Sequence, residues 1–245
     1  MKALVLAAGY ATRLYPLTKY YPKALLAVGT RPMINYIVDK LEEIKEIDEI
    51  IVVTNSKFCS IFKEWSRTIK TRKRISIVDD LTKSNETRKG AVGDIYFTVK
   101  KKKIEDGLLV IGGDNLFDQN LKGFLSCIRK KKGAPVIGVF DLKDRHNAKK
   151  YGVIKLDSKK KVVDFQEKPD KPKSTLVGMC LYYFPHETLA LVKDYVHDHT
   201  DIRDATGSYI DWLRKNIPVY GYVFKGKWFD IGDFKYLDEA SRKFS

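Results

Sequence analysis

Short apolar runs separated by stretches of helical periodicity fill the first half of the chain. The runs are KALVLAA at 2–8, EIIVVTN at 49–55, RISIVDD at 74–80, LLVIGGDN at 108–115 and APVIGVFDL at 134–142. Between them, apolar side chains recur with the helical period over 32–46, 90–103 and 121–132. Short continuous apolar runs are typical of strands buried on both faces. Because strands that alternate with helices form parallel crossovers, we expect a mainly parallel sheet covered by helices on both faces.

The second half of the chain is richer in strands. Its strand segments are a hairpin over 152–169, a strand over 176–185, and a strand pair or a strand with a loop over 219–232. Helical segments are expected over 186–197, 207–215 and 233–244. These patterns predict an α/β fold, a Rossmann-like three-layer sandwich with a mainly parallel mixed sheet and a small β-rich part. No linker or repeat interrupts the sequence, so we expect a single domain over 1–245.

Length and cysteine content narrow the class of protein. The chain has 245 residues, 44% of them hydrophobic, which is enough to bury a core without disulfides. Its three cysteines, Cys59, Cys127 and Cys180, form no CxxC pair and predict neither a zinc site nor a disulfide framework. No apolar run has the length of a signal-peptide core or the roughly 20 residues of a membrane span. We therefore expect a cytoplasmic protein without a membrane partner.

The formal net charge of +15 has two interpretations. Lys and Arg neutralise phosphates, so the excess could bind nucleic acid. The basic runs, however, fall at predicted helix ends and turns without interleaved aromatic residues, at 67–74, 100–103, 129–132 and 159–161. We therefore favour solvated helix faces over nucleic-acid binding, in a protein whose positive field attracts triphosphates.

The strongest chemical signal is the segment LVLAAGYATRLYPLTKYYPK at 4–23. A strand leads directly into a loop where Gly9 lets the backbone approach a phosphate without a Cβ in the way. Backbone N–H groups in such a turn can hold an anion. Arg13 can donate two hydrogen bonds to phosphate oxygens, and Lys23 adds a second cation. The loop has neither the Walker A pattern GxxxxGK[ST] nor the dinucleotide pattern GxGxxG.

This opening resembles that of the sugar-1-phosphate nucleotidyltransferase family, the NDP-sugar pyrophosphorylases, which include glucose-1-phosphate thymidylyltransferases and uridylyltransferases. Members begin with a strand, a loop of the form (A/G)-G-x-x-(S/T)-R-(L/M) and a later Pro-Lys, here at 8–14 and 22–23. Four further segments resemble the family's motifs in the same order: IGGDN at 111–115, YGVI at 151–154, FQEKP at 165–169 and KWFDIGD at 227–233. Ala11 departs from the pattern, because many members carry a second glycine there.

The resemblance implies a Mg²⁺-dependent enzyme that condenses a nucleoside triphosphate with a sugar 1-phosphate. It implies a nucleotide-binding half over 1–145 and a sugar-phosphate-binding half over 146–245, in which the β-rich part covers the substrate. The implied catalytic cations are Arg13, Lys23 and Lys168. The implied nucleotide-binding residues are Leu6, Ala8, Gly9, Tyr10, Ala11, Thr12, Arg13, Asn85, Gly90 and Asp114. The implied sugar-phosphate-binding residues are Gly152, Glu167, Lys168 and Gly178.

Two aspartates are candidate metal ligands. Asp114 follows a buried strand, where ligands bind in α/β sheets, and a carboxylate there suits Mg²⁺. Asp230 lies in a loop-like setting before Gly232. Taken alone, Asp114 could equally cap a helix and Asp230 could belong to an ordinary turn. The resemblance implies that both carboxylates hold one Mg²⁺.

The adjacent pair Glu167 and Lys168 poses a geometric problem. Neighbouring side chains on a strand point to opposite faces, so both cannot reach one substrate from an ideal strand. In the related family this pair borders the sugar phosphate. We therefore expect a bend at Pro169 to redirect the two side chains.

The segment expected to recognise the base leaves alternatives open. Asn85 stands five residues before Gly90, where family members often carry Gln, and its shorter side chain leaves the base undetermined. The acceptor could also be phosphocholine or another phosphorylated alcohol. A different class would be a non-catalytic regulatory or RNA-binding protein, although both Asp114 and Asp230 are retained. Members of the family commonly form oligomers, so a homo-oligomer is a further expectation.

Overall fold

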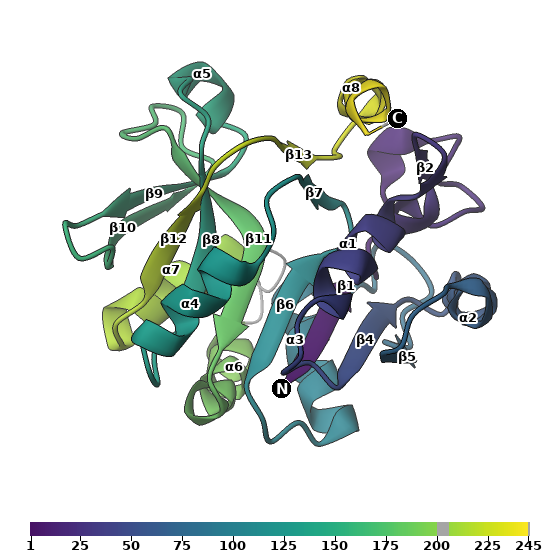
Figure 1. Cartoon of the computed structure of the whole chain (residues 1–245), viewed down its shortest axis with the longest axis horizontal. Helices are drawn as coiled ribbons and strands as arrows, with labels where there is room; N and C mark the ends of the chain where they lie inside the picture. Colours follow the sequence, from purple (N-terminus) through teal and green to yellow (C-terminus); the bar gives the residue numbers. More distant parts are fainter. Residues whose placement is uncertain (200–205, 245) are drawn as a thin grey trace.

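The computed structural model describes residues 1–199 and 206–244, and at its centre lies a nine-stranded sheet (Figure 1). The sheet's path is β10-β9-β11-β6-β1-β4-β5, and β8 pairs with both β11 and β12. Its strands are β1 (Lys2–Leu6), β4 (Glu49–Thr54), β5 (Arg74–Asp79), β6 (Leu108–Gly112), β8 (Val136–Asp141), β9 (Gly152–Leu156), β10 (Val162–Glu167), β11 (Leu176–Phe184) and β12 (Tyr220–Phe224).

Strand directions divide the sheet into two regions. β5, β4, β1 and β6 pair in parallel, as do β8 and β12. In contrast, β11 runs antiparallel to β6 and β8, and β9 and β10 form an antiparallel hairpin. The predicted α/β fold with a mixed, mainly parallel sheet is therefore confirmed.

Helices cover both faces of the sheet. They are α1 (Met33–Glu42), α2 (Cys59–Thr68), α3 (Gly90–Lys102), α4 (Lys122–Lys130), α5 (Arg145–Ala148), α6 (His186–Asp198), α7 (Thr206–Asn216) and α8 (Phe234–Lys243). Ala3 and Val5 of β1 pack in one core with side chains of α1, α2 and α4, whereas Leu4 packs in a second core with side chains of α3, α6 and α7. Successive side chains of a strand face opposite sides, so this alternation produces three layers, and α1 and α4 lie in front of the sheet in Figure 1.

A second, two-stranded sheet was not expected from the sequence. β7 (Asn115–Phe117) pairs antiparallel with β13 (Trp228–Asp230). The segment 219–232 was expected to be a strand pair or a strand with a loop. It contains two strands, but they belong to different sheets: β12 joins the central sheet and β13 joins β7. A further short pair, β2 (Ala27–Val28) and β3 (Arg31–Pro32), precedes α1.

The polar loops that follow β1 and β6 leave the sheet at the same edge. Leu6 and Gly112 are register partners at the ends of these parallel strands, and the amide of Gly113 donates to the Leu6 carbonyl over 2.9 Å. Ligands bind outside the carboxyl ends of strands in sheets of this kind. None of the described helices is long and apolar enough to cross a membrane.

Candidate active site

The loop after β1 leaves an open position at Gly9 and makes a left-handed turn at Ala11. A Cβ on Gly9 would meet no atom within 4 Å, so its backbone faces free space. Ala11 has φ 47° and ψ 45°, and the Thr18 hydroxyl donates to its carbonyl over 2.7 Å. A left-handed residue with a Cβ costs about 1 kcal/mol. Ala11 thus holds a conformation that glycine adopts without this cost.

A cavity of about 410 Å³ adjoins this loop. Six of the ten residues predicted to bind the nucleotide line it: Leu6, Ala8, Gly9, Arg13, Gly90 and Asp114. Arg13 belongs to a 3₁₀ turn, η1 (Thr12–Leu14), directly after the left-handed residue. Gly90 opens α3 with φ 75°, a value that favours glycine.

Four predicted nucleotide-binding residues do not line this cavity in the described part of the chain: Tyr10, Ala11, Thr12 and Asn85. Tyr10 is buried, and its hydroxyl lies 3.3 Å from the Thr82 hydroxyl. Asn85 lies in the loop before α3, where its carbonyl accepts from the Arg88 guanidinium over 3.0 Å. In this loop it is Arg88 that reaches the cavity.

Asp114 forms an ion pair with Lys23. Asp114 lies in the turn between β6 and β7, and Lys23 opens the 3₁₀ turn η2 (Lys23–Leu25). The Lys23 ammonium lies 2.6 Å from Oδ2 of Asp114. The pair therefore joins the loop after β1 to the end of β6, bringing together two predicted site residues that are distant in sequence.

The β7–β13 pair brings Asp230 beside Asp114. Asn115 and Asp230 are register partners, and the amide of Ile231 donates to the Asp114 carbonyl over 3.2 Å. Asn115 fixes this arrangement, because its side-chain amide donates to the Met179 carbonyl and its Oδ1 accepts from the Trp228 indole over 2.5 Å.

The environment of Asp230 suits a hard cation. Burial raises its pKa, and neighbouring Asp114 raises it further, while the Lys23, Arg13 and Lys168 cations partly offset both effects. The described residues include no cluster of three or more His, Cys, Asp or Glu side chains suited to a metal. A pair of carboxylates fits Mg²⁺, which takes one or two of them together with water and substrate phosphates.

A second cavity, of about 330 Å³, lies on the other side of Asp114. All four predicted sugar-phosphate-binding residues line it together with Asp114 and Asp230: Gly152, Glu167, Lys168 and Gly178. Burial raises the pKa of Glu167, and Lys168 beside it lowers that pKa in part. Asp114, Cys180 and Ala91 line both cavities, so the two spaces adjoin at these residues.

Glu167 and Lys168 face the same cavity because the chain bends at Lys168. Lys168 has φ 43°, and its ammonium lies 3.7 Å from Oε1 of Glu167. The Lys168 amide donates to the Tyr151 carbonyl over 3.1 Å. The bend expected at Pro169 is therefore found one residue earlier.

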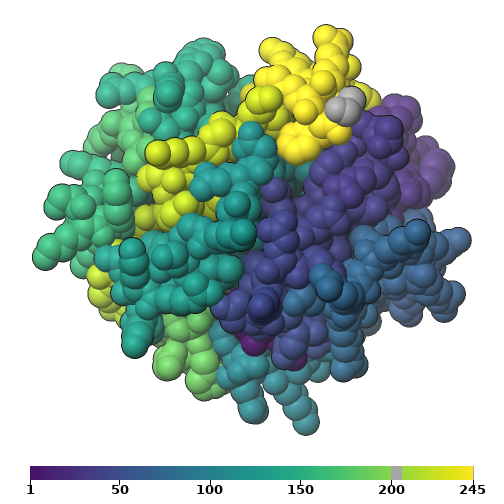
Figure 2. Space-filling view, in the orientation of Figure 1, coloured from purple at the N-terminus to yellow at the C-terminus, as the bar shows by residue number. Residues whose placement is uncertain are grey.

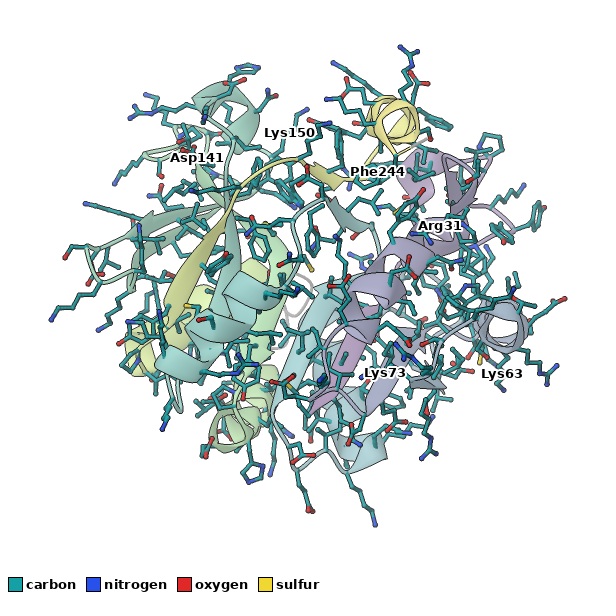
Figure 3. The ribbon with its side chains drawn as sticks, in the orientation of Figure 1. Arg31, Lys63, Lys73, Asp141, Lys150 and Phe244 are labelled. Carbon is teal, nitrogen blue, oxygen red and sulfur yellow. The ribbon has the colours of Figure 1, made fainter. Side chains whose placement is uncertain are left out.

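Several residues of the second cavity were missed by sequence reasoning: Lys150, Tyr151, Phe165, Cys180, Tyr182, Thr206 and Gly207. Figure 3 labels Lys150, in the part of the fold between α5 and β13. Tyr151 and Phe165 stand inside the motifs YGVI and FQEKP, so these motifs could have suggested them. Cys180 and Tyr182 come from β11, whereas Thr206 and Gly207 come from the start of α7, and only the tertiary structure brings these elements to one cavity.

The chain is similar to known proteins over nearly its whole length. The family model described as "Nucleotidyl transferase" matches residues 2–245. The bifunctional protein GlmU of Methanocaldococcus jannaschii is 28% identical over 95% of this chain, which spans 51% of that protein. A glucose-1-phosphate thymidylyltransferase of Xanthomonas campestris is 28% identical over 98% of this chain, which spans 79% of that enzyme. The chain thus has about half the length of GlmU.

Among solved structures, UDP-glucose pyrophosphorylase complexed with UDP-glucose superposes with a TM-score of 0.83 at 23% identity. The match covers 99% of this chain and 97% of that one. At this level of identity, the likeness establishes the shared fold.

Proposed function

Because this chain belongs to the nucleotidyl transferase family, we propose that it joins a nucleoside triphosphate to a sugar 1-phosphate and releases pyrophosphate. One observation supports the proposal: the cavity beside Gly9 and Arg13 and the cavity beside Glu167 and Lys168 are both lined by Asp114. A site for two phosphorylated substrates requires this, because their reacting phosphates must meet at one point.

The reaction needs no nucleophile from the protein. A phosphate oxygen of the acceptor attacks the α-phosphorus of the triphosphate, a new P–O bond forms, and the bond to the bridging oxygen of pyrophosphate breaks. The attacking phosphate is already an anion, so no proton must be removed. None of the described histidines lines either cavity. Catalysis then consists of positioning and charge neutralisation.

Each cation of the site has a place in this reaction. Arg13 lines the triphosphate cavity and would neutralise the departing pyrophosphate. Lys168 lines the acceptor cavity and would hold the acceptor phosphate. Lys23, paired with Asp114 between them, would steady the α-phosphate. Asp114 and Asp230 would hold Mg²⁺, which when bound neutralises charge on the substrates' phosphates.

The acceptor cavity favours a polyhydroxylated acceptor. The Glu167 carboxylate can accept hydrogen bonds, and the hydroxyls of Tyr182 and Thr206, 2.8 Å apart, can donate or accept them. Phosphocholine offers no hydroxyl to these groups. We therefore propose a sugar 1-phosphate as the acceptor. A cytoplasmic location is proposed as well, and a homo-oligomer stays a prediction.

A panel assay tests the proposal. The protein is incubated with Mg²⁺, each of the common nucleoside triphosphates, and glucose 1-phosphate, mannose 1-phosphate, N-acetylglucosamine 1-phosphate or phosphocholine, and released pyrophosphate is measured. We expect release with at least one sugar 1-phosphate and its loss in Asp114→Asn. Release with phosphocholine alone would identify the alternative acceptor. No release anywhere in the panel would contradict an enzymatic function.

A further inference from the structure

A groove of about 920 Å³, lined by basic side chains, lies away from the two cavities of the candidate active site. The residues along it come from the end of α4 and the following turn, the start of α6, and the segment between α7 and β12. They are Arg129, Lys130, Lys131, Lys132, Gly133, Ala134, Glu187, Thr188, Leu191, Ile217, Pro218 and Tyr220. Figure 2 shows the surface of α4 adjoining that of α6 at the lower left of the view.

Strand direction shows that the groove and the active site lie at opposite ends of the sheet's parallel strands. β8 runs parallel to β6, since both are antiparallel to the strand β11 between them. The groove lies where β8 and β12 begin, at Val136 and Tyr220, whereas Asp114 follows the end of β6. The groove is therefore separate from the substrate cavities.

Two of the basic runs in the sequence meet beside this groove. The Lys131 ammonium donates to the Lys159 carbonyl over 3.3 Å, and Lys161 forms a β-bridge with Tyr220. The amide of Gly221 also donates to the Lys160 carbonyl over 2.8 Å. The runs 129–132 and 159–161, separate in sequence, thus form one basic surface.

Lys131 differs from an ordinary solvated lysine. Its ammonium lies 4.0 Å from the centre of the Tyr220 ring, besides its bond to the Lys159 carbonyl. A cation held on two sides loses less conformational entropy when an anion binds. Within the described part of the chain, no carboxylate pairs with Lys130, Lys131 or Lys132, whereas Arg129 pairs with Glu46.

The composition of the groove indicates the class of ligand. Four cations and one carboxylate, Glu187, line it, so an anion is favoured. Leu191, Ile217 and Pro218 add an apolar wall that phosphates alone would not use. The volume lies in the range of roughly 300–1,000 Å³ that is usual for small-molecule sites.

We propose that this groove is a second binding site, for a small ligand with two or more linked phosphates such as a nucleoside polyphosphate. The ligand's phosphates contact the side chains of Lys130, Lys131 and Lys132, and its remainder lies along the apolar wall. The site is independent of the proposed reaction, since it shares no lining residue with the two substrate cavities.

Calorimetric titration with ATP, inorganic tripolyphosphate and a single-stranded RNA tests this site. Titrations at about 0.15 M salt, where exposed charges are screened beyond roughly 8 Å, use an Arg13→Ala background to weaken the active site. We expect one equivalent of ATP to bind, and at least tenfold weaker binding in Lys131→Glu/Lys132→Glu. ATP binding more tightly than tripolyphosphate would support a nucleoside polyphosphate as the ligand, whereas equal affinities would contradict the role given to the apolar wall.

The matched control reverses the charge of two lysines far from the groove, at the helix that packs on the edge strand β5. Lys63, labelled in Figure 3, lies in α2, and Lys70 follows this helix, which packs on β5. Lys63→Glu/Lys70→Glu should alter ATP affinity by less than twofold. If Lys131→Glu disturbs folding, Lys130→Glu/Lys132→Glu, which changes exposed side chains, replaces it.

Three results would overturn the proposal. The first is that neither ATP nor tripolyphosphate binds in the Arg13→Ala background. The second is that the two charge-reversed pairs weaken ATP binding equally. The third is that only RNA binds, with an affinity that rises with its length. The last result would assign the basic surface to a nucleic acid instead.

Discussion

The ammonium of Lys23 lies 2.6 Å from the carboxylate of Asp114, with only 16% and 33% of the two side chains exposed. Asp230 stands beside this pair, and the positive charge of Lys23 lowers its pKa in part. Lys23 therefore reduces the repulsion between the carboxylates of Asp114 and Asp230. A metal ion bound by both carboxylates would have the same effect.

Removing the Lys23 charge should lower both the stability of the fold and the rate of turnover. Lys23→Met leaves Asp114 without its partner, which we expect to cost about 1–3 kcal/mol in the free energy of unfolding measured by urea in EDTA. Millimolar Mg²⁺ should restore part of this loss. Turnover should fall by about 10² with saturating Mg²⁺. Lys19→Met, an exposed change in the same loop, serves as the control, and equal urea midpoints for the two variants would contradict the assignment.

The left-handed turn at Ala11 gives a second prediction. Glycine removes the conformational cost of φ 47° but gains more freedom in the unfolded chain, and the balance favours Ala11→Gly by about 0.5 kcal/mol. Thermal unfolding should therefore occur at a slightly higher temperature in this variant. Ala8→Gly, without a positive φ, should unfold earlier than the parent protein. A lower midpoint for Ala11→Gly would mean that the turn is not strained.

The elements that the sequence predicted well are those whose signal is local. Runs such as EIIVVTN become β4, because a strand buried on both faces needs only a short apolar run. Helix α2 was missed, since few of its residues are apolar and only Cys59, Phe62 and Trp65 mark its buried face. The β7–β13 pair was missed because its two strands have only three residues each and lie far apart in sequence.

The residues of the candidate site also fall into those with a local sequence signal and those that only tertiary contacts bring together. The phosphate-binding loop could be located from Gly9 and Arg13, whose chemistry is visible in one segment. The adjacency of Asp114 and Asp230 followed only from the resemblance, because Asn115 and Trp228 create it through tertiary hydrogen bonds. No local pattern shows that Gly207 lies against Glu167, since that contact depends on how α7 packs on β10.

Glu42 predicts a pH-dependent contribution to stability. Hydrogen bonds from the Thr71 hydroxyl and the Arg72 guanidinium lower its pKa to about 2 and tie the end of α1 to the segment before β5. The pKa of a glutamate in the unfolded chain is about 4.3. The folded pKa is the lower one, so the stabilisation is present above about pH 4.3 and is lost as pH falls toward 2.

The Glu42→Gln variant measures this contribution. We expect it to be less stable by about 1 kcal/mol at pH 7, where the carboxylate accepts its hydrogen bonds as an ion. The difference in urea midpoint between the two proteins should shrink between pH 5 and pH 3. A difference that stays constant over that interval would show that the charge of Glu42 has no part in it.

Gly207 gives a prediction for acceptor binding. A Cβ at this position would stand 2.0 Å from Oε2 of Glu167 and 2.7 Å from the Phe165 ring, so the Glu167 carboxylate must move in Gly207→Ala. Since Glu167 lines only the acceptor cavity of the two, KM for the sugar phosphate should rise about tenfold while KM for the triphosphate changes less than twofold. In a Glu167→Ala background, where no carboxylate is displaced, the same change should cost much less, and this non-additivity identifies the contact. Equal increases in both KM values, or fully additive effects, would place the role of Gly207 in general folding and not in positioning Glu167.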